Sequence, residues 1–146
     1  MNIVTMTEQW VPAVADLERR CFSEPWSEES LTDAIERPEF RYLIACEGDK
    51  MLGYGGFYVA ADEASITNIA TEPEARGRGV AGTVIEAIIK EASGMGAQTI
   101  YLEVRAGNEK AIRVYERCGF ERLGVRKGFY DKPKEDAYIY GYRIER

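Results

Sequence analysis

The 146-residue sequence contains no histidine, three cysteines and no long hydrophobic run. Because catalytic Ser-His and Cys-His pairs need an imidazole, those nucleophilic mechanisms are excluded within the chain. Cys21, Cys46 and Cys118 form no metal-binding pattern and are odd in number, so we expect no metal site and a reducing, cytoplasmic setting. No apolar run approaches the roughly 18 residues of a membrane span. The N-terminal residues also lack the basic and then apolar pattern of a secretory signal.

Positive charge is scarce relative to negative charge. The 19 Lys and Arg residues against 25 Asp and Glu residues give a formal net charge of −6. An acidic chain of this kind is not typical of a general nucleic-acid binder, and it suits a basic substrate. With 45% hydrophobic and 30% charged residues over this length, residues 1–146 are expected to form a single domain.

The segment from residue 65 to residue 82 carries the clearest chemical signal. A strand is predicted over 65–71, Pro73 breaks it, and a helix begins at about Val80. Between strand and helix, or at the first helical turn, lie three glycines and two arginines: Gly77, Gly79, Gly82, Arg76 and Arg78. Exposed amides, the helix dipole and the arginines would form a polyphosphate site. The alternative is a surface turn whose glycines only let the chain bend.

Hydrophobic periodicity and turn residues predict the remaining elements. Strands are expected over 2–5, 41–46, 51–59, 98–104, 121–127 and 136–144. Helices are expected up to about Arg20, between the N-cap Ser27 and Pro38, and from Asn108 to Gly119. The strand–helix–strand unit over 65–104 makes its two strands parallel, whereas the first strands form an antiparallel meander. Cys21 and Ile35 are expected on the inner faces of their helices.

The glycines fit two nucleotide-binding patterns. Gly77, Gly79 and Gly82 match G-x-G-x-x-G, and Glu103 follows about 20 residues later, as in a dinucleotide-binding domain. Residues 72–76, however, separate the strand from the glycines, and the chain is too short on the C-terminal side for a doubly wound fold. A dinucleotide-binding domain is therefore the weaker interpretation.

Arg76, Gly79 and Ala81 fit instead the Q/R-x-x-G-x-G/A pattern of the Gcn5-related N-acetyltransferases (GNAT), and the chain resembles that superfamily. Within it, nearly the whole chain resembles the bacterial ribosomal-protein-alanine N-acetyltransferases. The matching segments are Cys21-Phe22, Pro25-Trp26-Ser27, Glu63-Ala64, Asn68-Ile69-Ala70, Pro73, Leu102-Glu103-Val104-Arg105, Asn108, Tyr115-Glu116, Gly119-Phe120, Arg126, Tyr130 and Glu135-Asp136-Ala137. Two positions depart from the expected pattern, because Thr71 replaces a more usual Val and Gly128-Phe129 replaces Asn-Tyr.

The resemblance implies a GNAT fold and acetyl-CoA as co-substrate. The fold is mixed α/β (α+β), with a mostly antiparallel sheet of about seven strands, one parallel pair and about four flanking helices. The pantetheine arm would pair with one strand, and the pyrophosphate would lie on the glycine-rich amides. The implied cofactor-binding residues are Ile69, Ala70, Thr71, Arg76, Gly77, Arg78, Gly79, Val80, Ala81, Gly82 and Asn108. Asn108 could alternatively serve only as a helix N-cap.

The resemblance also implies catalytic and acceptor-binding residues. Glu103 would be the general base, directly or through water, and Tyr115 would protonate the departing CoA thiolate. Residue type alone favours an exposed strand carboxylate and a core tyrosine at these positions. Trp26, Tyr130 and Tyr138 are the implied substrate contacts.

The implied reaction acetylates the α-amine of an N-terminal alanine, in a small-subunit ribosomal protein. At pH 7, deprotonation costs roughly 1.0–1.4 kcal/mol for an α-amine and roughly 4.6 kcal/mol for a lysine, which favours the α-amine. The acidic face of Glu28, Glu29, Asp33 and Glu36 would be either a solvated surface or a docking site for a basic peptide. Acetylation of small amines or lysines, and a non-catalytic CoA sensor, are the alternatives. We expect a monomer that binds neither nucleic acid nor membranes.

Overall fold

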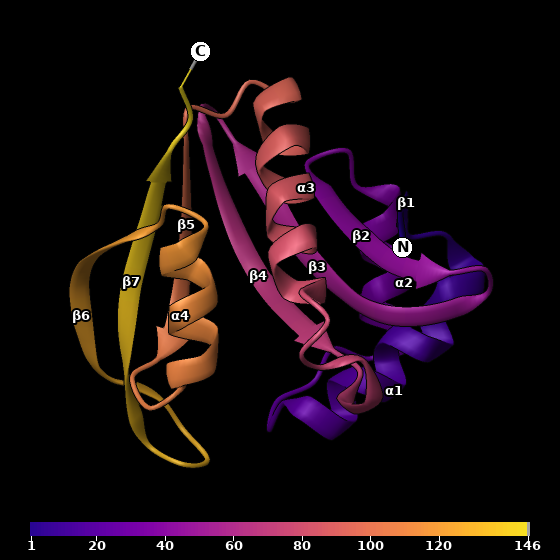
Figure 1. The fold of residues 1–146 in the computed structure, drawn as a ribbon, viewed down its shortest axis with the longest axis horizontal. Helices are drawn as coiled ribbons and strands as arrows, with labels where there is room; N and C mark the ends of the chain where they lie inside the picture. Colours follow the sequence, from indigo (N-terminus) through magenta and orange to yellow (C-terminus); the bar gives the residue numbers. More distant parts are fainter. Residues whose placement is uncertain (146) are drawn as a thin grey trace.

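The computed structural model describes residues 1–145 of the chain. These residues form one seven-stranded sheet with the order β1-β2-β3-β4-β5-β7-β6 (Figure 1). The strands are β1 (Asn2–Thr5), β2 (Phe40–Glu47), β3 (Lys50–Ala60), β4 (Glu63–Thr71), β5 (Thr99–Arg105), β6 (Glu121–Tyr130) and β7 (Glu135–Arg143). The helices are α1 (Val11–Cys21), α2 (Glu28–Glu36), α3 (Val80–Gly94) and α4 (Glu109–Arg117), with the short 3₁₀ turns η1 (Glu8–Trp10) and η2 (Pro73–Ala75). The predicted mixed, mostly antiparallel architecture is confirmed.

The helices cover both faces of the sheet and form two cores. Figure 1 shows α3 and α4 on the near face, whereas α1 and α2 lie behind the sheet. On the near face, α3 buries Val84, Ile85 and Ile88 completely against the strands. On the far face, Leu17 of α1 and Leu31 of α2 are equally buried. The sheet thus separates two apolar cores.

The parallel pair β4–β5 is short. Its register contains Glu63 opposite Thr99, Ala64 opposite Ile100 and Ser65 opposite Tyr101, and no further pair within the described residues. Beyond Ser65 the two strands diverge, and they enclose a wedge that widens toward the bottom of Figure 1. The predicted parallel crossover through α3 is therefore confirmed, and the sheet is open where β4 ends.

Local sequence signals set the helix boundaries. The Ser27 hydroxyl accepts a hydrogen bond from the Ser30 amide at 3.1 Å, which confirms Ser27 as the N-cap of α2. After α4, Gly119 adopts φ +97°, as expected of a residue just past a helix end. Within the part of the chain that the structure describes, no helix combines the length and apolar character needed to cross a membrane.

Two predictions of inward-facing residues are wrong. Ile35 is 36% exposed, because α2 turns Leu31 and Ala34 to the core and Ile35 is rotated about 100° from Ala34. Cys21 is exposed at the last position of α1, where it lines a cleft that is described below. Periodicity predicted both positions without information on where each helix leaves the core.

Candidate active site

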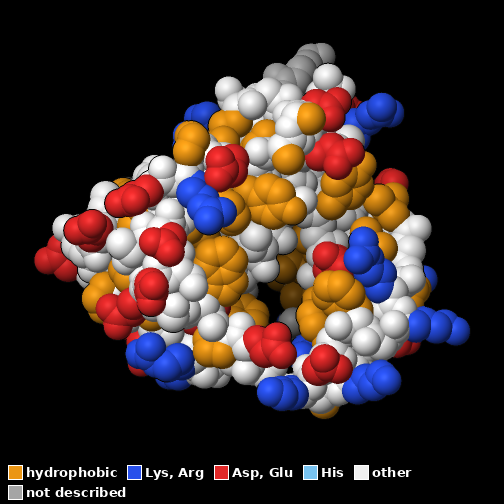
Figure 2. Space-filling model, turned by 180° about the vertical axis from the view of Figure 1, so that it is seen from behind, with side chains coloured by type: hydrophobic (Ala, Val, Ile, Leu, Met, Phe, Trp, Pro, Cys, Tyr) orange, Lys and Arg blue, Asp and Glu red, His pale blue; other side chains and the backbone are white. Residues whose placement is uncertain are grey.

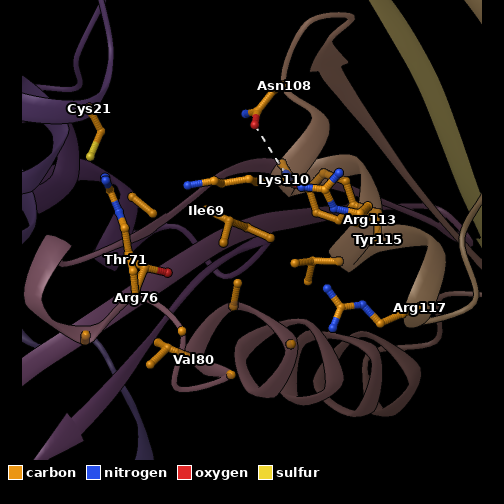
Figure 3. A pocket seen from close by; sticks show the side chains of 18 of the residues that line it. Cys21, Ile69, Thr71, Arg76, Val80, Asn108, Lys110, Arg113, Tyr115 and Arg117 are labelled. Carbon is orange, nitrogen blue, oxygen red and sulfur yellow. Dashed lines mark hydrogen bonds between the residues drawn. The ribbon is translucent and has the colours of Figure 1, made fainter.

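A cleft of about 780 Å³ lies at the opening between β4 and α4, a volume typical of small-molecule sites. Four elements contribute to it, namely the end of α1, the end of β4 with the loop that follows, the first turn of α3 and one face of α4 (Figure 3). Ten of the eleven residues predicted to bind a cofactor line this cleft: Ile69, Ala70, Thr71, Arg76, Gly77, Gly79, Val80, Ala81, Gly82 and Asn108. The structure therefore gathers residues that are up to about 40 positions apart in the sequence.

The first turn of α3 presents its amides to the cleft. Gly77 and Gly79 adopt φ +84° and +77°, conformations that side chains other than Asn and Asp rarely take. These conformations bring the chain into the helix at Val80, whose first-turn amides have no acceptor within the helix. A Cβ atom at Gly82 would meet no other atom within 4 Å, so the missing side chain leaves open space beside the helix end. This geometry is typical of an anion site.

Basic side chains surround the cleft, and none of the described residues that line it is acidic. They are Arg20, Arg76, Lys110, Arg113 and Arg117. Figure 3 shows Arg76 facing Lys110 and Arg113 across the cleft. Arg20 and the three cations of α4 are not among the site residues predicted from the sequence. The spacing i, i+3, i+7 of Lys110, Arg113 and Arg117 was a usable signal, since such positions share one helix face.

The end of β4 has one free edge. On one side Ile69, Ala70 and Thr71 pair with Gly55, Tyr54 and Gly53 of β3. On the other side β5 has already diverged, so the β4 backbone faces the cleft without a strand partner in the described sheet. An extended chain or an amide-bearing ligand can add to such an edge by main-chain hydrogen bonds.

Asn108 caps α4 at the rim of the cleft. Its side-chain oxygen accepts a hydrogen bond from the Ala111 amide at 3.3 Å, drawn as the dashed line in Figure 3. The N-cap interpretation of Asn108 is therefore confirmed. Because Asn108 also lines the cleft, the cap places a polar side chain where a ligand can reach it.

Tyr115 reaches the cleft from α4. Its ring packs near Phe120, with 6.1 Å between ring centroids. Burial raises the pKa of the Tyr115 hydroxyl above its usual value, and the neighbouring Tyr130 adds to this effect. The hydroxyl therefore keeps its proton at neutral and mildly alkaline pH, as a proton donor must.

Glu103 lies on the opposite face of β5. Leu102 and Val104 point into the core beneath α3 and α4, so the alternation of the strand directs Glu103 to the other side, where it is exposed. Its carboxylate is 3.4 Å from the Arg126 guanidinium. Burial and then the charge of Glu103 raise the pKa of Tyr130, which makes Tyr130 an electrostatic neighbour of both Glu103 and Tyr115.

The two faces of the sheet meet at the wedge between β4 and β5. Figure 2 shows the face opposite α3 and α4, and that face is hollowed between the half that carries α1 and α2 and the half that carries β6 and β7. Glu103 thus belongs to the face seen in Figure 2, whereas α3 and α4, which line much of the cleft, lie on the other face.

Comparison with known proteins assigns this arrangement to a family. Residues 11–120 match the model described as the Acetyltransferase (GNAT) family. The chain belongs to this family. A curated relative, [ribosomal protein bS18]-alanine N-acetyltransferase of Escherichia coli strain K12, is 32% identical over 142 residues, which cover 95% of each chain.

Solved GNAT structures share the fold. The crystal structure of the ribosomal-protein-S18-alanine N-acetyltransferase of Escherichia coli is 30% identical and has a TM-score of 0.89, with 99% of this chain and 94% of that chain covered. Arabidopsis thaliana NAA60 in complex with acetyl-CoA has a TM-score of 0.86 at 19% identity, with 98% of each chain covered, and shows the same fold. The predicted family and the predicted acyltransferase activity are confirmed.

Five predicted site residues do not line the cleft: Glu103 and Tyr130, described above, and Arg78, Trp26 and Tyr138. The Arg78 guanidinium is 2.7 Å from the Glu47 carboxylate at the surface. Trp26 is half-buried against the rings of Phe40 and Tyr42, at centroid distances of 6.2 and 5.9 Å. Tyr138 lies opposite Val104 in the β5–β7 ladder and beneath the Arg122 guanidinium, 4.6 Å from its ring centroid. Their binding roles stay predictions.

Two further findings concern the GNAT site. Gly128, where the family pattern has Asn, adopts φ +63°, a conformation that Asn also tolerates, so this departure preserves the backbone of the β6–β7 end. Among residues 1–145, no group of three His, Cys, Asp or Glu side chains lies close enough to hold a metal ion. All three cysteines are free thiols.

Proposed function

We propose that this protein transfers the acetyl group of acetyl-CoA to the N-terminal α-amine of another protein. The proposed acceptor is an N-terminal alanine of a small-subunit ribosomal protein, in line with the printed name of the Escherichia coli relative. The observation that carries the proposal is the wedge between β4 and β5, since it lies between a cleft lined by basic side chains and a carboxylate on the opposite face.

The cleft suits acetyl-CoA in three parts. Its pyrophosphate would lie on the first-turn amides of α3, with Arg76 and the cations of α4 supplying positive charge. Its pantetheine amides would pair with the free edge of β4 at Ile69–Thr71, like an added strand. The thioester would then lie in the wedge, within reach of both faces of β5.

The proposed chemistry is a direct transfer. Glu103, directly or through one water molecule, takes a proton from the acceptor ammonium, and the amine nitrogen attacks the thioester carbonyl carbon. Backbone amides near Ile69 and Ala70 would stabilise the oxyanion of the tetrahedral intermediate. The intermediate collapses as the C–S bond breaks and the N–C bond remains, and the Tyr115 hydroxyl donates a proton to the departing sulfur. As the amide forms, its nitrogen loses its second proton to water. Glu103 then releases its proton to solvent, and the Tyr115 phenolate takes one up.

The face that would receive the acceptor is acidic. On α2, Glu28, Glu29, Asp33 and Glu36 are all exposed, and this helix covers the same face of the sheet on which Glu103 lies. Acidic side chains gather on the corresponding side of Figure 2. A basic N-terminal segment would be attracted to this face, which supports a cationic protein as the acceptor.

An acetyl-CoA assay read by mass spectrometry tests the proposal. Two versions of a basic peptide that begins with alanine would be supplied, one with a free N-terminus and one N-terminally blocked with an internal lysine. We expect acetylation of the first peptide alone. Modification of the blocked peptide would reassign the enzyme to lysine side chains. Acetylation of spermidine in preference to either peptide would reassign it to small amines.

A further inference from the structure

Glu18 of α1 is 1% exposed and is the one charged residue that is fully buried among residues 1–145. Its carboxylate accepts three hydrogen bonds, from the Tyr54 hydroxyl, from the Asn68 side-chain amide and from the Trp26 backbone amide at 2.8 Å. These donors belong to β3, to β4 and to the segment between α1 and α2. Glu18 therefore joins three parts of the far face of the sheet.

The two carboxylate oxygens of Glu18 accept hydrogen bonds from different donors. One oxygen, Oε1, receives the Trp26 amide, and the other, Oε2, receives both the Tyr54 hydroxyl and the Asn68 amide. Burial and then the charge of Glu18 raise the pKa of Tyr54, so its hydroxyl stays protonated and keeps donating. Because an apolar side chain of similar volume commonly stabilises a core as well as a buried charge, stability alone does not explain this residue.

The network of Glu18 extends to the two predicted binding regions. Asn68 directly precedes the Ile69–Thr71 edge that faces the cleft, and its side-chain oxygen accepts a hydrogen bond from the Tyr42 hydroxyl at 3.0 Å. Trp26 contacts the ring of Tyr42 on the same face. At its start, the segment of residues 22–27 lines the cleft through Phe22. Through hydrogen bonds to Trp26 and Asn68, the buried Glu18 carboxylate thus links this segment to β4, the strand that borders the cleft.

We propose that Glu18 is a positioning residue for the acceptor. Its carboxylate holds the 22–27 segment against β4, so that the amine enters the wedge at a fixed place relative to the thioester. Glu18 lines no part of the cleft. The inference rests on the proposed function only for the identity of the acceptor.

The test is Glu18→Gln, which keeps the shape of the side chain. The amide oxygen should stay with the two donors from Tyr54 and Asn68, so the new NH₂ group faces the Trp26 amide and that hydrogen bond is lost. We expect the KM for the peptide to rise about tenfold, with the KM for acetyl-CoA changed by less than about twofold. Hydrogen exchange at the Trp26 amide should accelerate in the same variant.

Two control variants separate positioning from loss of stability. Tyr54→Phe removes a donor from Oε2 and leaves the Trp26 contact, so it should lower Tm with the peptide KM within about twofold of wild type. Ile88→Val weakens the other core, on α3, and should lower Tm with both KM values unchanged. A Glu18→Gln enzyme that loses Tm and keeps the wild-type peptide KM would overturn the proposal.

The outcome stays distinguishable from failure of the proposed function. If the wild-type enzyme acetylates a different amine, the KM of that amine replaces the KM of the peptide, and the same prediction holds. If Glu18→Gln does not fold, hydrogen exchange at the Trp26 amide of the wild-type protein provides the test. Exchange as fast as in an unconstrained loop would show that Glu18 does not hold this segment in place.

Discussion

Glu103 and Tyr115 lie on opposite sides of β5, and their surroundings suit them to opposite proton transfers. Glu103 is exposed on the far side, with its carboxylate 3.4 Å from the Arg126 guanidinium. Tyr115 is half-buried on the near side, where desolvation of its hydroxyl raises its pKa and keeps the hydroxyl protonated. These surroundings are the ones that the proposed base and the proposed acid require.

The Glu103→Gln variant tests the proposed base. We expect kcat to fall about 100-fold at pH 7, because the amine must then lose its proton without help. The Kd of acetyl-CoA, measured by calorimetry, should not change, since Glu103 does not line the cleft. The deficit should shrink above about pH 8, where the α-amine loses its proton in solution. Glu121→Gln, an exposed carboxylate of β6, is the matched control; equal kcat in both variants would remove Glu103 from the mechanism.

The Tyr115→Phe variant tests the proposed acid. We expect kcat to fall at least about tenfold while Tm stays close to wild type, because the ring that packs near Phe120 is retained. Tyr142→Phe is the control, since its ring also packs near Phe120, at a centroid distance of 5.3 Å, and lies outside the cleft. Wild-type turnover of Tyr115→Phe would assign the residue to the core alone.

At the scale of single elements, α4 combines a stabilising N-cap with a set of cations that line the cleft. Its first residues are capped by Asn108, and the same helix supplies Lys110, Arg113 and Arg117 to the cleft. The helix therefore fixes where three cations stand relative to the first turn of α3. A loose N-terminus of α4 would move those charges together with the cap.

Two substitutions of Asn108 separate the cap from ligand binding. Asn108→Ala removes the capping oxygen and should destabilise the protein by about 1 kcal/mol, whereas Asn108→Ser keeps a capping oxygen and should retain most of the stability. We expect both variants to raise the KM for acetyl-CoA about fivefold, because neither keeps an amide that can reach the cofactor. Thermal unfolding and KM measured together provide the test. A wild-type KM in Asn108→Ser would limit Asn108 to its role as the cap.

Sequence periodicity located the elements of this fold, because strand alternation and helical faces are local properties. It misplaced Cys21, which lies at the end of α1, and Ile35, which α2 turns away from the core side marked by Leu31 and Ala34. It also missed Glu18, whose charge is typical of a solvent-facing position on an amphipathic helix. Only contacts with Tyr54 and Asn68, which are 36 and 50 positions away, bury that charge and give it partners. Such partners follow from the sheet order and cannot be derived from local spacing.

The whole molecule is organised by the short parallel pair. β4 and β5 share three register pairs and then diverge, although both strands continue for several residues. The strand–helix–strand pattern predicted the parallel pairing. From the residues alone, no feature of β5 indicated how early the ladder stops. The proposed transfer nevertheless depends on this divergence, because the thioester would have to reach the face of Glu103 from the cleft.

Tyrosines with raised pKa values make the free energy of unfolding of the whole molecule depend on pH in the alkaline range. Burial raises the pKa of Tyr42, Tyr54 and Tyr115 in the folded protein above the usual value of about 10. Below about pH 10 these groups are protonated in both states, so their contribution to stability is constant. Above it, the unfolded chain releases protons that the folded chain retains, so the free energy of unfolding falls as pH rises further.

Urea unfolding at pH 8 and at pH 11 measures this effect. We expect a lower midpoint at pH 11, and we expect tyrosinate absorbance of the buried rings to appear only together with loss of the circular dichroism signal. Tyr42→Phe should start less stable at pH 8, because it loses the hydrogen bond to Asn68, and should lose less stability than wild type between the two pH values. If all nine tyrosines of the still-folded protein ionised near pH 10, the raised pKa values would be contradicted. The alkaline limit would then have to come from other groups, such as lysines that lose their charge in the same range.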